Sequence, residues 1–144
     1  ERVIGRKMAG WFSPAASFTA NTPDLVAEAG FKYYCDFYHD DRPYPIKTRS
    51  GKLVSLPYTR EVNDSISWRR GEEGEDFERL VRDEFDTLYA EGGRVMCIAV
   101  HPFIMGQPHR IESLDRALGY VLGHERVWCA TGAEIVDCYL SQAE

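Results

Sequence analysis

The clearest pattern in the chain is a repeat of apolar residues every three or four positions, with charged residues between them. In residues 75–91 the apolar positions are 77, 80, 81, 85, 88 and 89, and a Gly-Gly pair follows. This spacing predicts an amphipathic helix that ends at the glycines. Residues 111–122 have the same rhythm and stop at Gly123, so they predict a second amphipathic helix.

Two shorter helices are predicted from their terminal residues. In residues 21–31, Thr22 is the expected N-cap, a proline takes the first helical position and Gly30 ends the helix. Residues 131–142 form the last predicted helix, with Thr131 as its expected N-cap. Both segments therefore start with a hydroxyl group that can accept a hydrogen bond from an otherwise free backbone N–H.

Short apolar runs alternate with these helices and predict strands. Glycine, proline or polar residues bound the runs, which is typical of strands. The predicted strands are residues 6–12, 32–38, 53–58, 94–100 and 126–130. Residues 39–52 and 59–74 contain turn residues and no clean period, so loops are predicted there.

This alternation favours an α/β fold in which helical crossovers join parallel strands. No GxGxxG or GxxxxGK[ST] sequence is present, so nucleotide binding has no support. The length of 144 residues is that of one ordinary domain, and we interpret residues 1–144 as a single domain. The chain begins at Glu1 and reaches an apolar strand almost at once, which suggests that a front part is missing.

Composition and charge exclude several kinds of partner. The net charge of −6 argues against a nucleic acid, because a phosphate backbone is bound by a basic face. No apolar run reaches the roughly 18 residues of a membrane span, and no signal peptide is visible, so no membrane partner is expected. The four cysteines form no CxxC pair and lie mainly in apolar runs, which is typical of reduced thiols in a cytoplasmic protein.

The stretch RVMCIAVHPFIMGQPHR, residues 94–110, places His101 directly after a predicted buried strand. In parallel α/β folds the functional groups gather at the carboxyl ends of the strands, so His101 is a candidate catalytic residue. Gly106 allows close approach in the following loop, and Arg110 is a candidate for binding an anion or a carbonyl group. The alternative for a lone histidine is a purely structural role.

Carboxylates follow another predicted strand in CDFYHDDRPY, at Asp36, Asp40 and Asp41. A charge among aromatic residues is costly unless it has a partner, and Asp36 occupies such a position. A carboxylate beside an imidazole orients the ring and favours its charged form. We therefore predict that Asp36 pairs with His101 in a general-acid unit, although most acidic loops are simply solvated.

Two further strand ends add candidate substrate contacts. LPYTREVND places Asn63 and Asp64 after one strand, and GWFSPAAS places Trp11, Phe12 and Ser13 after another. Four strand ends with such groups indicate one shared pocket. Trp11 is equally compatible with a place in the core, and the general polarity of loops is the alternative explanation for the rest.

Three stretches, GWFSPAASFTANTPDLVAEAGFKYYCDFYHDDRPY, LVSLPYTREVND and VHPFIMGQPHR, resemble the polysaccharide deacetylase family, also called the NodB-homology family. The resemblance covers nearly the whole chain and is strongest to the allantoinase-like and cyclic-imidase-like branch. It implies the C-terminal portion of a distorted parallel (β/α) barrel with fewer than eight repeats. It also implies hydrolysis of a C–N bond in an amide, an acetamido group or a cyclic imide.

The resemblance implies roles for individual residues as well. His101 matches the histidine that protonates the leaving nitrogen, Asp36 matches the aspartate that supports it, and residues 11–14 match one wall of the substrate groove. Many deacetylases have an arginine where this chain has Phe12, which favours the allantoinase-like branch. Typical members carry a catalytic aspartate and an Asp-His-His metal site upstream of these motifs. A divalent metal such as zinc is therefore expected only with ligands outside this chain.

The sequence thus predicts the C-terminal half of a C–N hydrolase of carbohydrate or related metabolism. Its expected substrate is a small amide, a cyclic imide or an N-acetylated sugar. We expect the half alone to be inactive, since the water-activating base would be absent, and the complete protein to be a homo-oligomer. A non-catalytic binding or interaction module with the same fold is the main alternative, and an unrelated flavodoxin-like domain is a weaker one.

Overall fold

The computed structural model describes residues 3, 5 and 7–142. Its contacts divide the chain into two compact units, which we call the sheet unit (residues 1–58 and 129–144) and the helical unit (residues 59–128). The chain combines one β-sheet with helices, so the predicted α/β class is confirmed. Within the described residues, no helix combines the length and the apolar character that a membrane crossing requires.

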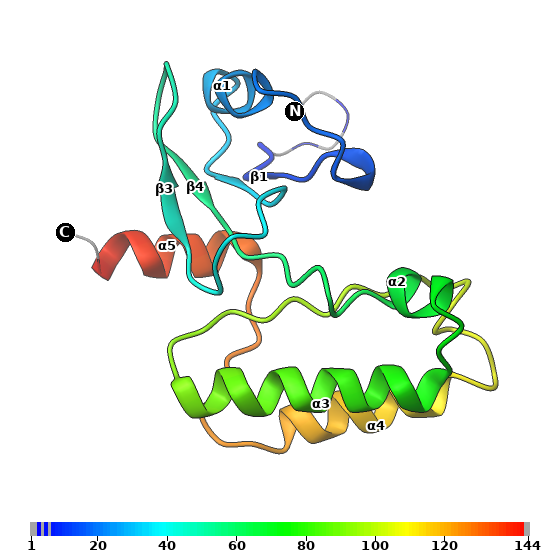
Figure 1. Ribbon diagram of the computed structural model, residues 1–144. Helices are drawn as coiled ribbons and strands as arrows, with labels where there is room; N and C mark the ends of the chain where they lie inside the picture. The colour runs from blue at the N-terminus through cyan, green and yellow to red at the C-terminus, as the bar shows by residue number, and fades with distance from the viewer. Residues whose placement is uncertain (1–2, 4, 6, 143–144) are drawn as a thin grey trace. The chain divides into compact units, whose positions relative to one another are not determined.

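A four-stranded mixed sheet forms the centre of the sheet unit (Figure 1). β1, β2 and β4 are parallel, with Tyr33 opposite both Gly10 and Val54. Gly10 is required here because a Cβ atom would collide with the Tyr33 ring. The sheet has the spatial order β1-β2-β4-β3, and its strands are β1 (Gly10–Trp11), β2 (Tyr33–Tyr34), β3 (Tyr44–Ile46) and β4 (Leu53–Ser55).

Three predicted strands are therefore present, but each is shorter than the apolar run that predicts it. β1 covers two residues of the predicted span 6–12, of which residue 6 lies outside the described residues. β2 and β4 likewise occupy only the start of the spans 32–38 and 53–58. Most of the remaining residues of the 32–38 and 53–58 spans lie beyond the carboxyl ends of β2 and β4.

The structure corrects the loop that the sequence predicts for residues 39–52. This segment contains β3, which pairs antiparallel with β4 and places Pro45 opposite Val54. Proline cannot donate to a hydrogen-bond ladder, so the sequence argues against a strand there. β3 lies at the edge of the sheet, however, and an edge strand tolerates proline.

α1 (Thr22–Glu28) joins β1 to β2 as a helical crossover, as the alternation predicts. Its N-cap is Asn21 rather than the expected Thr22, which is already helical. The expected stop at Gly30 is confirmed, because Gly30 has φ +78°, a left-handed conformation that glycine adopts without strain. Buried residues of α1 and the sheet share one core, formed by Val26, Ala27, Tyr34 and Leu53.

α5 (Gly132–Gln142) is the last described helix, and Thr131 caps it as expected. The Glu134 backbone N–H donates to Thr131 Oγ1 at 3.4 Å, and the Glu134 carboxylate accepts the Thr131 backbone N–H at 2.7 Å. These two bonds satisfy N–H groups that have no partner inside the helix. Val136 of α5 is fully buried and packs with Val54 and Leu56.

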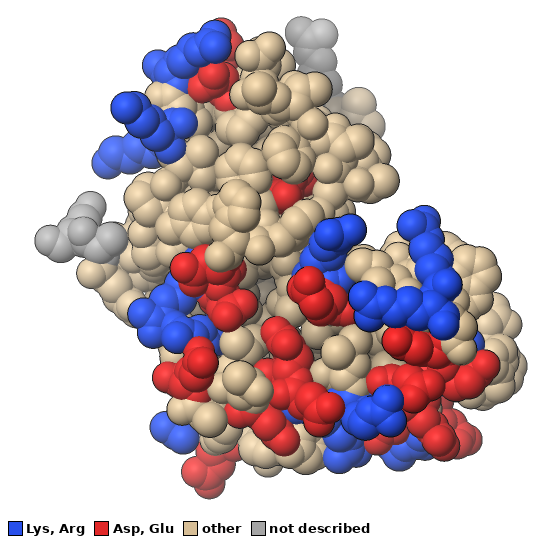
Figure 2. Space-filling view, viewed as in Figure 1, with Lys and Arg blue, Asp and Glu red and all other residues tan. Residues whose placement is uncertain are grey.

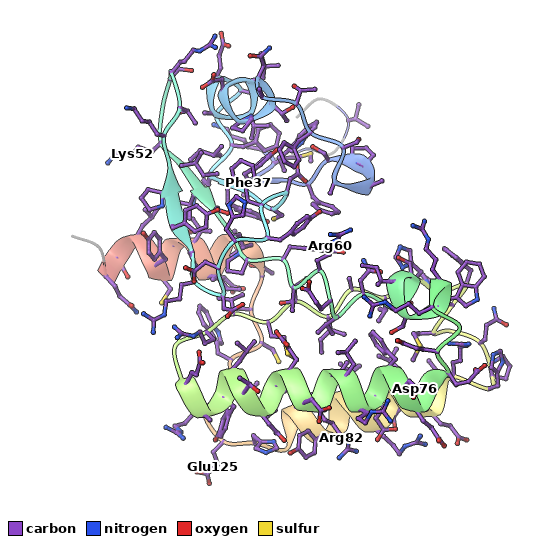
Figure 3. The ribbon with its side chains drawn as sticks, in the orientation of Figure 1. Phe37, Lys52, Arg60, Asp76, Arg82 and Glu125 are labelled. Carbon is purple, nitrogen blue, oxygen red and sulfur yellow. The ribbon has the colours of Figure 1, made fainter. Side chains whose placement is uncertain are left out.

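In the helical unit, α3 (Gly74–Glu91) and α4 (Ile111–Leu122) lie side by side (Figure 1). Both agree with the predicted bounds to within one residue. Charged side chains of both signs cover α3 (Figure 2), and Asp76 and Arg82 project from it (Figure 3). The apolar faces meet in a core of Val62, Phe77, Val81, Phe85, Ile104, Met105, Ala117 and Val121.

The predicted loop over residues 59–74 is also corrected, because it contains the short helix α2 (Asp64–Arg69). Asn63 is the N-cap, and its side chain accepts the Ser65 backbone N–H at 2.9 Å. A helix of six residues is too short to show an apolar period, so the pattern cannot reveal it. Asparagine followed by an acidic residue was the available signal for a helix start.

The prediction of strands at residues 94–100 and 126–130 is wrong, because neither segment forms a regular strand. The first is extended, but its pairing is limited to one parallel bridge between Ala99 and Asn63. The Cys97 backbone N–H donates to the Thr59 hydroxyl, a side-chain group, where a ladder would supply a carbonyl. The second segment starts at Arg126 with φ +63°, a left-handed conformation that interrupts an extended strand.

Candidate functional site

His101 stands in the helical unit, where the extended segment 94–100 turns into a compact loop. The His101 carbonyl accepts the backbone N–H groups of Ile104 and Met105 at 2.9 and 3.0 Å. Both of these side chains are buried, so they anchor the turn in the core. Gly106 completes the turn, because a Cβ atom there would collide with the Pro102 carbonyl.

Asp64 binds His101 through both of its carboxylate oxygens. One oxygen accepts the His101 backbone N–H at 2.6 Å, and the other lies 2.6 Å from ring Nδ1. Asp64 is 1% exposed, whereas the His101 side chain is 39% exposed. An ionised carboxylate can only accept hydrogen bonds, so this contact places the Nδ1 proton toward Asp64 and leaves Nε2 as the atom that can reach a substrate.

The chain brings Asp64 to His101 through the only parallel bridge described in the helical unit, which joins Asn63 to Ala99. Ala99 donates its N–H to the Val62 carbonyl at 2.9 Å, and its own carbonyl accepts the Asp64 N–H at 3.0 Å. Asn63 then starts α2 as its N-cap. The segments that end at Asp64 and at His101 therefore lie next to each other, and the Asp64 side chain contacts His101.

The expected pairing of Asp36 with His101 stays a prediction, since the two residues belong to different units, and within its own unit Asp36 binds Ser13. In the sheet unit, Asp36 Oδ1 accepts the Ser13 backbone N–H at 2.8 Å, and Asp36 Oδ2 accepts the Ser13 hydroxyl. The Trp11 indole N–H in turn donates to Ser13 Oγ at 3.0 Å. β1 and β2 are neighbours, so the residue after one strand faces the residue after the other. Asp36 therefore stabilises the Trp11–Ser13 turn.

Tyr34 completes this buried group. Burial raises the pKa of the Tyr34 hydroxyl well above its ordinary value, and the nearby Asp36 carboxylate adds to that effect. The hydroxyl makes no well-aligned hydrogen bond, although it has no exposure to solvent. Asp36 is 1% and Ser13 is 3% exposed, so these two sequence-predicted site residues lie below the surface of the sheet unit.

Arg110, the candidate for anion or carbonyl recognition, is 7% exposed and binds groups of the protein. Its Nη1 donates to the Glu72 carbonyl at 3.1 Å, and its Nη2 donates to the Glu73 carboxylate at 2.9 Å. Its Nε contacts His109 Nε2 at 3.2 Å. Arg110 precedes α4 and Glu73 precedes α3, so the guanidinium ties together the starts of the two long helices.

The two remaining carboxylate candidates lie in the loop between β2 and β3. Asp40 is exposed and accepts the Arg42 backbone N–H at 2.9 Å, which is a local turn contact. Asp41 is half-buried.

Phe103, Tyr38 and Tyr58 stand near candidate site residues, and the sequence did not single them out. Phe103 follows His101, and the centroids of the two rings are 5.4 Å apart. In the sheet unit, Tyr58 stacks on Phe12 with ring centroids 4.7 Å apart, and Tyr38 lies 5.9 Å from Tyr58. The available signal was position, since Tyr38 and Tyr58 each follow a parallel strand along the chain.

Among the described residues, no three His, Cys, Asp or Glu side chains gather so that they could hold a metal ion. The family resemblance places the metal ligands outside this chain, so this finding applies to the described residues alone.

The chain was compared with known proteins. No family model matches it. A Schizosaccharomyces pombe protein assigned as a polysaccharide deacetylase is 32% identical over an alignment 151 positions long, which takes in 90% of this chain and 46% of the relative. The sequence-based resemblance to polysaccharide deacetylases is thus confirmed.

Solved structures give the same result for the fold. The Puue allantoinase structure has a TM-score of 0.83 and 33% identity, over 92% of this chain and 46% of that protein. A Pseudomonas aeruginosa PAO1 structure assigned as a polysaccharide deacetylase has a TM-score of 0.84 and 31% identity, over 96% and 48% of the two chains. The chain therefore spans about half the length of the relatives that it matches.

Proposed function

We propose, on the premise that this chain is a relative of polysaccharide deacetylases and of an allantoinase, that the protein hydrolyses a C–N bond other than a peptide bond. In this proposal His101 is the general acid and Asp64 is its positioning residue. The main observation behind this proposal is that the buried Asp64 carboxylate contacts both the backbone N–H and the ring Nδ1 of the half-exposed His101.

The chemistry requires a proton at the leaving nitrogen. When water adds to the carbonyl carbon and the C–N bond breaks, the nitrogen leaves readily only if it takes up a proton. An imidazolium can donate that proton from Nε2 while Asp64 balances its charge through Nδ1. General acid catalysis of this kind contributes roughly 10²–10⁴ in rate.

Activation of the attacking water is a separate task, which needs a base on the other side of the carbonyl group. We assign only the acid step to this chain and expect the base to come from residues outside it. The substrate classes that fit the acid step are a small amide, a cyclic imide and an N-acetylated sugar, because each loses an amide nitrogen.

The experiment is an assay of the full-length protein and its His101→Ala variant on one substrate of each class. We expect the variant to lose roughly 10²–10⁴ in kcat on the accepted substrate, with little change in melting temperature. A variant with normal turnover and a lower melting temperature would show that His101 is structural. Wild-type protein that binds these compounds but turns over none of them would favour the non-catalytic module.

A further inference from the structure

The short helix α2 buries two polar side chains, Asp64 and Ser67. Asp64 is 1% exposed and Ser67 is 2% exposed. Residues three positions apart are neighbours on a helix surface, so the two side chains point to the same side of α2. On that side Asp64 binds His101. The buried Ser67 hydroxyl needs a hydrogen-bond partner of its own.

Glu72 is the partner of Ser67 and holds the end of α2. The Ser67 hydroxyl donates to the Glu72 carboxylate at 2.6 Å, and the Glu72 backbone N–H donates to the Ser67 carbonyl at 3.1 Å. The Glu72 carbonyl in turn accepts Nη1 of the buried Arg110 at 3.1 Å. Arg110 ends the compact loop that begins at His101. α2 and the loop after His101 are therefore joined at both ends, once through Asp64 and once through Glu72.

These attachments set the orientation of α2, which lies near the start of α3 (Figure 1). A helix of six residues is too short to be stable alone, so contacts with its surroundings must fix it. Asn63 caps its first turn, and Ser67 is bonded one turn later. Rotation of α2 about its axis would carry the short Asp64 side chain out of hydrogen-bond distance of His101. The bond between Ser67 and Glu72 opposes this rotation.

We propose that Ser67 and Glu72 are positioning residues that hold the Asp64 carboxylate against the His101 ring. They act through α2 and Asp64, and not on a substrate. For its effect on rate, this inference rests on the proposed role of His101 as the general acid. A ring that Asp64 holds less closely presents Nε2 less often in the productive orientation. Such a loss lowers kcat and leaves the binding of the substrate largely unchanged.

The test compares the Ser67→Ala variant with wild type in the full-length protein. We expect kcat to fall about 3- to 30-fold, less than the roughly 10²-fold that a misplacement of about 1 Å can cost. KM should stay within about twofold of wild type. In the nitrogen NMR spectrum of the His101 ring, the tautomer with its proton on Nδ1 should lose population. Alanine is a good helix former, so the change itself does not disfavour α2.

Ser113→Ala is the matched control, because Ser113 is also a buried helical serine of the helical unit, and its hydroxyl accepts Arg116 Nη2 at 3.0 Å. We expect it to leave kcat and the His101 tautomer unchanged. Glu72→Ala should reproduce the effects of Ser67→Ala, and it serves as the second variant if Ser67→Ala does not fold. Glu72→Gln should stay close to wild type, because its side-chain carbonyl still accepts a hydrogen bond. The Ser67→Ala/Glu72→Ala double variant should be no worse than either single variant, since both remove the same bond.

The His101 tautomer separates this inference from the proposed function. A Ser67→Ala variant that melts at a lower temperature but keeps the wild-type tautomer and kcat would show that the bond is purely structural and overturn the proposal. If His101→Ala turns over substrate normally, the acid step fails, and a changed tautomer in Ser67→Ala still supports the positioning role. If His101→Ala is inactive and Ser67→Ala keeps the wild-type tautomer, the acid step stands and the positioning role is wrong.

Discussion

Asp64 holds His101 at two points, since one carboxylate oxygen accepts the His101 backbone N–H and the other contacts ring Nδ1, each at 2.6 Å. The backbone contact fixes where the chain turns, and the ring contact fixes how the imidazole is oriented. Asp64 is almost fully buried, so its position does not depend on solvent. A histidine held in this way presents Nε2 in one orientation.

The first prediction separates Asp64 from Asp36 as the partner of His101. Asp64→Asn places an amide NH₂ opposite Nδ1 and disfavours a proton there, so kcat should fall on the order of 10²-fold. Asp36→Asn should affect kcat much less and lower the melting temperature, because it removes an acceptor of the Ser13 contacts. Both quantities are measured on the full-length protein. A larger kcat loss from Asp36→Asn would support the pairing of Asp36 with His101 that the sequence predicts.

Ser13 is predicted to contribute to stability through the buried Asp36 carboxylate. Ser13→Ala removes a hydroxyl that donates to Asp36 and should cost about 1–3 kcal/mol of the free energy of unfolding. Ser17→Ala is the control, because Ser17 is exposed and donates only to the Pro14 carbonyl of the same turn. We expect it to stay within about 0.5 kcal/mol of wild type in urea unfolding. Equal stabilities of the two variants would argue against the buried network.

We predict that Arg110 stabilises the fold of the helical unit. Arg110→Ala removes its contacts with the Glu72 carbonyl and the Glu73 carboxylate and should lower the free energy of unfolding by about 1–3 kcal/mol. Arg110→Lys should recover only part of this, because an ammonium group lacks the planar fork. A raised KM with unchanged unfolding in urea would instead support the substrate contact that the sequence suggests.

Glu134 makes the stability of the α5 start dependent on pH. The Thr131 backbone N–H, and then the Thr131 hydroxyl, lower the pKa of Glu134 below its ordinary value of 4.5. A carboxyl whose pKa is lowered in the folded state adds stability above its unfolded pKa, and this stability is lost as the pH falls through the folded pKa. NMR titration of Thr131→Val should show the Glu134 pKa partly restored toward 4.5, since the backbone bond remains. No change in that pKa would show that the hydroxyl does not contribute.

The sequence by itself determined those features that depend on a local, repeated pattern. α3 and α4 were predicted almost to the residue because each shows several turns of an apolar period with glycine at its end. The Thr131 cap was predicted because capping is a contact between residues three apart. α2 and the edge strand β3 were missed, since six residues show no period and Pro45 argues against a strand.

Only the tertiary structure decided which groups meet. The sequence placed several carboxylates after apolar segments, and His101 after another, but local patterns do not say which segments become neighbours. The bridge between Asn63 and Ala99 brings Asp64 to His101, and the pairing of β1 with β2 brings Ser13 to Asp36. A short polar side chain reaches only a few ångströms, so the pairing of backbone segments distant in sequence selects its partner.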